Sequence, residues 1–271
     1  MAIGRDRGRY LRLFFLLIFT AIALTPIAVT VILSITPRLG SKETGLTLNN
    51  FVYVFQQTLA LAWFGNSMLV SLVTVVVSVA VAAPAGYVLS RGRSQAVSAY
   101  SLLLFVIQSL PIITSVIPLF ILFAKFGLVD NLGGLMIIYV GSSMSVATWM
   151  MAAYFDSIPK SLEEAAWIDG CSLLGGFVRI VLRNSLPGVL STAIFTFLLA
   201  WNDYLVAIVF LKTDTGFTLP IGLQSFFQEN VTDWGSVMAV SVMMMLPPVV
   251  VFATLNRYFS IGGLDGALAG R

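Results

Sequence analysis

Charge is scarce in this sequence, and histidine is absent altogether. Only 10% of the 271 residues are charged and 58% are hydrophobic, whereas a water-soluble domain carries roughly 25% charged residues. Without histidine, the chain has no imidazole base, no histidine proton relay and no zinc site of the usual kind. Its single cysteine, Cys171, excludes an internal disulfide. These shortages argue against a soluble domain, a zinc protein and a disulfide-stabilised fold, and we predict no metal.

A phosphate-binding loop is also missing. The motif GxxxxGK[ST] requires a lysine directly after a glycine, and none of the four lysines has one before it. The net charge of +3 comes from arginines at the ends of apolar runs, which is typical of membrane topology rather than of a nucleic-acid-binding patch. We therefore predict no catalytic residue, no cofactor and no nucleic-acid partner, with any ATP hydrolysis on another chain.

Long uncharged runs are what the sequence has instead. A helix of about 20 apolar residues crosses the roughly 30 Å hydrocarbon core of a bilayer. The first run continues to Ile35, well past the roughly 7–15 residues of a signal-peptide core, so it indicates an uncleaved helix. The Thr44–Ala60 segment mixes amides with aromatic side chains and suits the outer membrane surface. The sequence thus predicts one all-α, polytopic membrane domain over residues 1–271, with six spans at about 13–35, 63–89, 97–124, 132–155, 187–211 and 234–256.

The positive charges support this count of six spans. If the N-terminus is cytoplasmic, eleven lysines and arginines fall in cytoplasmic segments and four in outer segments. This asymmetry satisfies the positive-inside rule. A seventh span at Thr44–Ala60 would invert every later segment and remove the asymmetry. We therefore predict a cell (inner) membrane protein of the bacterial type with both termini in the cytoplasm.

The longest predicted cytoplasmic loop, residues 156–186, has the pattern of two short helices. Ser161 and Glu164 have the spacing of a capping box at the start of the first helix. Gly170 is suited to end that helix in a left-handed conformation, and Ser172 to cap the second helix. The small side chains of the first helix would let another protein's surface approach closely.

Seven positions of this loop form a longer pattern: Glu164, Ala165, Ala166, Asp169, Gly170, Ile180 and Leu182. The pattern resembles the "EAA" loop of permeases in binding-protein-dependent ABC importers. Arg183 stands where that family usually has a proline, and the family's second characteristic proline is present as Pro187. The resemblance implies that the seven residues form an ATPase-coupling element, which transmits nucleotide-driven closure of a separate ATPase subunit to the membrane helices.

Other segments resemble the smaller permease of maltose-type carbohydrate importers. They are Gly65–Ser67, Ala200–Asp203, Thr218–Leu223, Asp233–Gly235 and the tail Gly263–Ala267, with Ala269 near the position of an expected lysine. This resemblance implies a carbohydrate (sugar, oligosaccharide or polyol) as the transported solute. It also implies as partners a second homologous permease, two ATP-binding ATPase subunits, an extracytoplasmic substrate-binding protein and membrane lipid.

Asp203 is an acidic residue within an apolar run, and Asn202 precedes it. A charge inside the bilayer costs on the order of several kcal/mol, so the carboxylate should face a partner or water. Two interpretations stay open for this pair. It lines the pathway and binds sugar hydroxyls, or it forms an interhelical hydrogen bond to the partner permease, which the precedent of polar side chains between membrane helices favours.

Other functions are compatible with the composition. An ion-coupled secondary carrier usually has internal repeats and several ionisable groups in the membrane, where this chain offers only Asp203. An intramembrane enzyme would need histidine or paired carboxylates. A membrane assembly factor outside the ABC class is opposed only by the Glu164–Pro187 pattern, and an ABC permease for a non-sugar solute such as glycerol phosphate stays open.

Overall fold

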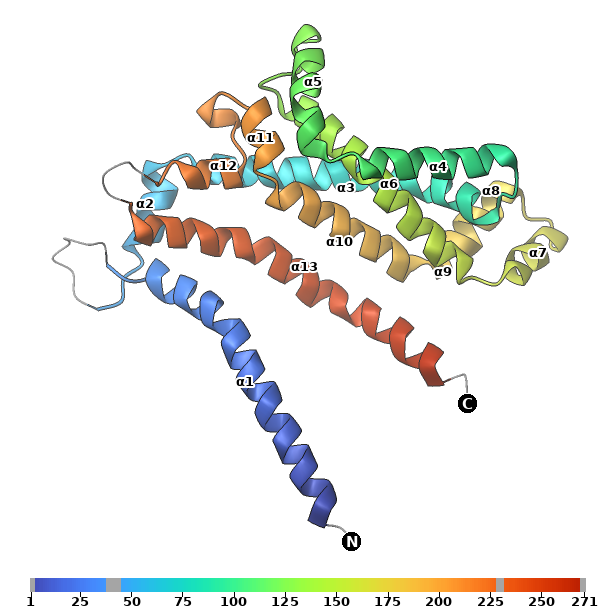
Figure 1. The fold of residues 1–271 in the computed structure, drawn as a ribbon, viewed down its shortest axis with the longest axis horizontal. Coiled ribbons are helices and arrows are strands. Elements are labelled where there is room, and N and C mark those ends of the chain that lie inside the picture. The colour runs from blue at the N-terminus through green and yellow to red at the C-terminus, as the bar shows by residue number, and fades with distance from the viewer. Residues whose placement is uncertain (1–2, 38–44, 228–231, 269–271) are drawn as a thin grey trace. The chain divides into compact units, whose positions relative to one another are not determined.

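The computed structural model describes residues 3–37, 45–227 and 232–268, and the side chains within them up to Leu255 from Arg9 onward. Within these ranges all regular structure is helical (Figure 1). Among the described residues, four helices are long and apolar enough to cross a membrane, or up to six if each of two bent pairs counts as one span. The predicted all-α, polytopic class is therefore confirmed. The chain forms two compact units, Met1–Leu61 with Gly222–Leu246, and Ala62–Ile221 with Pro247–Arg271.

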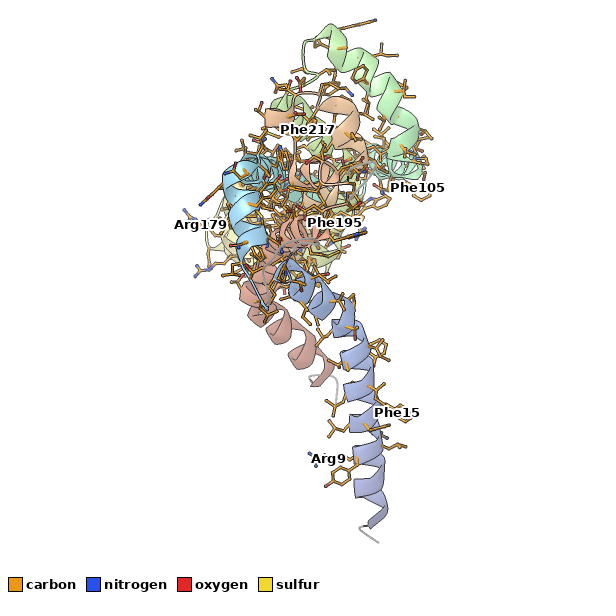
Figure 2. All side chains as sticks on the ribbon, turned by 90° about the vertical axis from the view of Figure 1, so that its left-hand side faces the viewer. Arg9, Phe15, Phe105, Arg179, Phe195 and Phe217 are labelled. Atoms are coloured by element: carbon orange, nitrogen blue, oxygen red, sulfur yellow. The ribbon has the colours of Figure 1, made fainter. Side chains whose placement is uncertain are left out.

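The first unit contains α1 (Ile3–Ser34), α2 (Asn49–Gln57) and the beginning of α13 (Trp234–Leu268). The apolar stretch of α1 is exposed on all sides: none of its most apolar 18-residue window is buried. Figure 2 shows the side chain of Phe15 projecting outward from this helix, and Phe15 is exposed. A helix that is apolar all round is stable in a lipid environment or against other protein, so α1 has the surface of a membrane helix.

Asn50 holds the first unit together. Its side chain is 1% exposed, and Nδ2 donates hydrogen bonds to the carbonyl oxygens of Ser34 (2.9 Å) and Thr36 (2.8 Å). Gly235 lies so close that an added Cβ would be 2.6–2.8 Å from Asn50 side-chain atoms. In the predicted surface segment Thr44–Ala60, whose first residue lies outside the described ranges, the helix α2 is therefore anchored by a buried amide.

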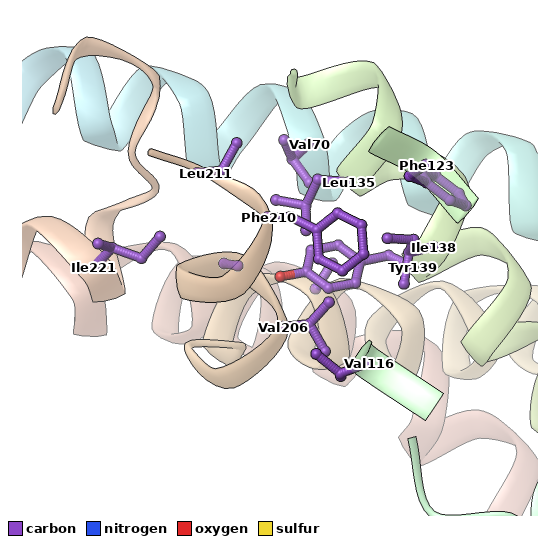
Figure 3. Close-up of a cluster of buried hydrophobic side chains, with 12 residues drawn as sticks. Val70, Val116, Phe123, Leu135, Ile138, Tyr139, Val206, Phe210, Leu211 and Ile221 are labelled. Carbon is purple, nitrogen blue, oxygen red and sulfur yellow. The ribbon is translucent and has the colours of Figure 1, made fainter. Parts of the chain in front are cut away.

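The second unit is built on α3 (Ala60–Arg91), α6 (Leu132–Asp156) and α10 (Leu186–Asn202). Most of the remaining described helices connect or cover them: α4 (Gln95–Ser109), α5 (Ile112–Lys125), α7 (Lys160–Ile168), α8 (Leu173–Gly176), α9 (Leu182–Asn184), α11 (Leu205–Phe210) and α12 (Leu219–Gln224). Figure 3 shows one core of this unit, where Phe210 and Tyr139 lie among aliphatic side chains. These two rings and Leu135 are at most 1% exposed.

Two predicted spans are interrupted. The stretch 97–124 consists of α4 and α5, which meet at 94° around Pro111 (Figure 1). Proline has no amide hydrogen to continue a helix, which accounts for a break at this position. The stretch 187–211 ends its first helix at Asn202 and resumes at Leu205 as α11. At its other end, α10 forms a 75° bent pair with the helical segment Leu173–Asn184.

Candidate functional site: the loop between α6 and α10, and a cavity at Asp203

The loop after α6 contains two short helices, as the sequence predicts. Gly170 ends α7 with a φ of +85°, the left-handed conformation that glycine adopts without strain. Ser172 begins α8, and its hydroxyl accepts a hydrogen bond from the amide of Gly175 at 3.1 Å. Both predicted helix signals are therefore confirmed.

The predicted capping box at the start of α7 is wrong. The helix begins at Lys160, directly after Pro159, and the Pro159 N-cap makes no side-chain hydrogen bond. Pro159 takes the N-cap position with a non-helical ψ of 128°, so the helix begins two residues before a helix capped by Ser161 would begin. Ser161 and Glu164 consequently lie within the helix, and the Glu164 side chain is free of a capping role.

The seven residues of the predicted coupling pattern separate into two groups. Along α7 and its end, Glu164, Ala165, Asp169 and Gly170 are exposed, and Ala166 is half-buried. Ile180 and Leu182 are also half-buried but belong to the following segment, where Leu182 packs on a buried core cluster that includes Phe155, Phe177 and Val181. The first group is therefore mostly exposed, whereas Leu182 of the second group packs against the core.

Large apolar side chains extend the exposed surface, and the seven-residue pattern does not contain them. Ile168 is 87% exposed, Leu174 71% and Leu173 65%. Exposed apolar side chains that gather beside a loop mark a contact with another protein or with lipid. In the sequence, large apolar residues on both sides of the helix-ending Gly170 are the signal that could have identified them as part of this surface.

Glu163, the neighbour of Glu164, is the principal residue that sequence reasoning missed. Its side chain is 2% exposed and forms an ion pair with Arg91, with 2.6 Å between Oε1 and Nη2. The Tyr87 hydroxyl donates to its other carboxylate oxygen at 2.6 Å. The pair joins α7 to the end of α3, across 72 positions of sequence. A run of two glutamates does not indicate which of them faces inward.

Asp203 lies at the break between α10 and α11, not within a helix as predicted. Its Oδ1 accepts hydrogen bonds from the Tyr139 hydroxyl (2.6 Å) and from the amides of Val206 (3.1 Å) and Ala207 (3.0 Å). The carboxylate thus satisfies two amides that open α11. Asn202 is exposed and donates to the carbonyl of Leu198, one turn back in its own helix. The structure therefore does not bring Asn202 and Asp203 into one site.

A cavity of about 630 Å³ opens beside Asp203, between α4, α5, α6, α10 and α11. Its wall is mostly aliphatic and contains five polar side chains: Gln108, Ser115, Tyr139, Ser142 and Asp203. Within the described part of the chain, every hydrogen bond of the Asp203 side chain ends on Oδ1. Oδ2 therefore keeps its capacity to accept a hydrogen bond. An apolar cavity with a few polar groups is the usual form of a small-molecule site.

Asp130 fixes the segment that follows α11. Its carboxylate accepts hydrogen bonds from the amides of Lys212 (2.8 Å) and Thr213 (3.0 Å) and from the Thr213 hydroxyl. These bonds, above all the one from the Thr213 hydroxyl, hold the pKa of Asp130 below its ordinary value. The link joins the turn between α5 and α6 to the chain leaving α11.

This architecture is that of a polytopic, all-helical membrane protein with an exposed loop of two short helices. The chain belongs to the family described as binding-protein-dependent transport system inner membrane component, whose model matches residues 79–260. The family places it among the membrane components of ABC importers, as the loop pattern predicts.

Curated relatives and a solved structure agree with this family. The chain is 34% identical over 226 residues to the inner membrane ABC transporter permease protein YcjP of Escherichia coli, covering 83% of this chain and 81% of the relative. The arabinooligosaccharides transport system permease protein AraQ of Halalkalibacterium halodurans is 34% identical over 82% of this chain and 80% of its own. The trehalose/maltose transport system permease protein MalG of Thermococcus litoralis is 32% identical over 86% of this chain and 85% of its own length. The fold matches a bacterial ABC transporter that imports alginate, with a TM-score of 0.79, 23% identity and coverage of 96% of this chain and 98% of that chain.

Proposed function

We propose that this chain forms half of the translocation pathway of an ATP-driven importer for a carbohydrate. Relatives that are named for arabinooligosaccharides, maltodextrin and trehalose/maltose support a sugar, oligosaccharide or polyol as the transported solute. The solute reaches the pathway from an extracytoplasmic binding protein. A second homologous permease forms the other half, and two ATPase subunits on separate chains hydrolyse ATP. Both termini lie in the cytoplasm.

The exposed surface of the loop between α6 and α10 carries the proposal of ATPase coupling. Glu164 and Ala165 face outward, and Ile168 beside them is 87% exposed. An apolar side chain so exposed in a water-facing loop is stabilised when a partner covers it. We assign this surface to contact with an ATPase subunit, whose closure moves the loop and the helices attached to it.

The cavity supports a pathway role for Asp203 but not for Asn202, because only Asp203 lines it. Asp203 lines the cavity, its hydrogen-bond partners among the described residues all meet Oδ1, and one of them is the Tyr139 hydroxyl, so Oδ2 is the oxygen we assign to a solute hydroxyl. Carbohydrates present many hydroxyl donors, whereas the aliphatic wall suits their C–H faces. Asn202 is assigned to the surface toward the partner permease because it is exposed outside this cavity.

Two substitutions in the loop test the coupling. Glu164→Lys reverses an exposed charge, and Gly170→Val places a β-branched residue at a φ of +85°. We expect both variants to insert and accumulate normally, while uptake and the binding-protein stimulation of ATP hydrolysis fall sharply. Gly127→Val is the matched control, because Gly127 also has a positive φ (+66°) and open space around it but lies outside the loop.

The measurements are subunit abundance, retention of the ATPase in the purified complex, stimulated ATPase activity and uptake. If Glu164→Lys and Gly170→Val both assemble and transport as well as the Gly127→Val control, the loop is not the coupling element. The assignment of the surface to an ATPase contact then fails.

A further inference from the structure

Two adjacent glutamates of α7 differ sharply in exposure. Glu164 is exposed, whereas the Glu163 side chain is 2% exposed. Neighbouring side chains on an α-helix point about 100° apart, so one residue can face a partner while the next faces the protein. We propose that Glu163 is a positioning residue, which fastens α7 to the end of α3 through Arg91, so that a movement of the loop moves α3 as well. This inference rests on the proposed function, because it concerns how the loop's movement is transmitted.

The contact uses both carboxylate oxygens of Glu163. Oε1 accepts hydrogen bonds from Arg91 Nε (2.8 Å) and lies 2.6 Å from Nη2, while Oε2 accepts from the Tyr87 hydroxyl (2.6 Å). Arg91 Nη2 also donates to the carbonyl of Ile158 (3.2 Å), and Nη1 donates to Ser90 Oγ (2.9 Å). The guanidinium therefore binds α7, its own helix and the connection between α6 and α7 at once.

Burial makes this contact persistent. The Arg91 side chain is 15% exposed and that of Glu163 2%. Separation of the two would leave a charge in a poorly solvated place without its partner, which is far less favourable than keeping the pair. Both guanidinium nitrogens, Nε and Nη2, meet the same oxygen, Oε1, and the Tyr87 hydroxyl holds the other oxygen, so the carboxylate is fixed from two sides. When α7 moves, α3 therefore moves with it, because the ion pair does not separate.

The ion pair gives α7 a contact with α3 that the backbone does not supply. α7 follows α6 after a connection of three residues, 157–159, and leads through α8 and α9 into α10. The backbone therefore passes movement of the loop to α6 and α10 directly, whereas α3 ends 72 positions before Glu163. Tyr87 of α3 adds a ring contact to Phe177 at 4.8 Å on the same side. α3 also packs directly on α6, where the Ser90 hydroxyl donates to Asp156, and the ion pair adds a direct contact between α3 and α7.

Spin labels on the purified complex test the proposal directly. Val88 of α3 and Lys160 of α7 are both exposed and can be replaced by cysteine after Cys171→Ser. We expect the distance between the labels to be the same without nucleotide and with trapped nucleotide. In Glu163→Gln the distance should become state-dependent or broaden. Binding-protein stimulation of ATPase activity should fall by a factor of about 2 to 30, the range for residues in a coupling network.

The controls separate positioning from folding. Arg93→Gln removes an exposed arginine two positions from Arg91 and should change neither the distance nor the stimulation. Arg91→Glu combined with Glu163→Arg restores opposite charges and should recover part of the stimulation that each single change removes. Recovery by the reversed pair shows that the effect depends on opposite charges at this contact, and equal subunit abundance in all variants shows that the loss of stimulation is not a loss of folding.

Three results would overturn the proposal. The first is a state-dependent distance in the otherwise unchanged protein, which decides the question even if the Glu163 variants do not accumulate. The second is full stimulation in Glu163→Gln. The third is a failure of the reversed pair to recover any stimulation. Glu164→Lys is measured in parallel. If it also has no effect, the proposed coupling function of the loop is contradicted. If Glu164→Lys lowers uptake but the Glu163 variant does not, only the proposed role of Glu163 is contradicted.

Discussion

The hydroxyl of Tyr139 and the carboxylate of Asp203 lie 2.6 Å apart and join α6 to the break between α10 and α11. Because the same oxygen also accepts two amides of α11, the carboxylate determines where the interrupted helix resumes. The other oxygen accepts no hydrogen bond within the described residues, and Asp203 lines the cavity. One residue therefore combines a structural task with the chemistry that a hydroxyl-rich solute would require.

Asp203→Asn separates these two tasks. The amide keeps a carbonyl oxygen that can replace Oδ1, but it substitutes a donor for the free acceptor Oδ2. We expect normal complex retention and a lower uptake rate. Tyr139→Phe is the comparison variant, since it removes one hydrogen bond and should lower stability by about 1 kcal/mol. If Asp203→Asn instead loses the second permease, the residue belongs to the subunit interface rather than to the pathway.

Gly188 allows α10 to lie against α6. An added Cβ would be 2.2 Å from Cγ of Tyr154, which is too close for any real contact. Gly188→Ala should therefore destabilise the protein by about 1–3 kcal/mol, as overpacked sites do. Thermal unfolding of the purified complex measures this loss. Gly65→Ala is the control, because that glycine has open space around it; equal melting temperatures for both variants would contradict the close approach.

The position of α2 can be tested by cysteine labelling. Asn50 is unsuitable as a probe, because its buried side chain binds two carbonyls. Gln56 is exposed and makes no such contact in the described structure. After Cys171→Ser, we expect Gln56→Cys to react with an impermeant reagent added outside the cell. Reaction only from the cytoplasmic side would overturn the proposed topology.

The link at Asp130 should depend on pH in a defined direction. Because the folded-state pKa of Asp130 is below its ordinary value, its carboxylate stabilises the fold above the unfolded-state pKa of about 3.9. That contribution is lost as the pH falls through the lower, folded-state pKa. The difference in melting temperature between the native chain and Asp130→Asn should thus be constant from about pH 5 to 8 and shrink in stronger acid. A difference that grows on acidification would contradict this sign.

Local signals predicted much of the loop. Gly170 and Ser172 act within one turn of their own positions, and both perform the predicted roles. The capping box at Ser161 failed for an equally local reason, the earlier helix start set by Pro159. The all-α, polytopic fold class was predicted from the length and density of apolar runs, which can be read directly from the sequence. Such features require no knowledge of distant partners.

Features that depend on distant residues could not be predicted. The choice of Glu163 over Glu164 as the inward residue is made by Arg91, 72 positions away. The break after Asn202 is stabilised by Tyr139, which lies 64 positions before Asp203. A single sequence gives no sign of either pairing, since each residue alone is compatible with an exposed or a buried site. The cavity, whose wall comes from five helices, is hidden for the same reason.

Uptake by the purified complex in lipid vesicles tests the proposed transport function most directly. The carbohydrate-loaded binding protein is added on the outer face of the complex and ATP on the ATPase face, and no ion gradient is applied. We expect carbohydrate to accumulate only when both are present, with a complex that contains this chain, a different permease and two ATPase subunits. Accumulation driven by a proton or sodium gradient without ATP would contradict the proposal and favour an ion-coupled carrier.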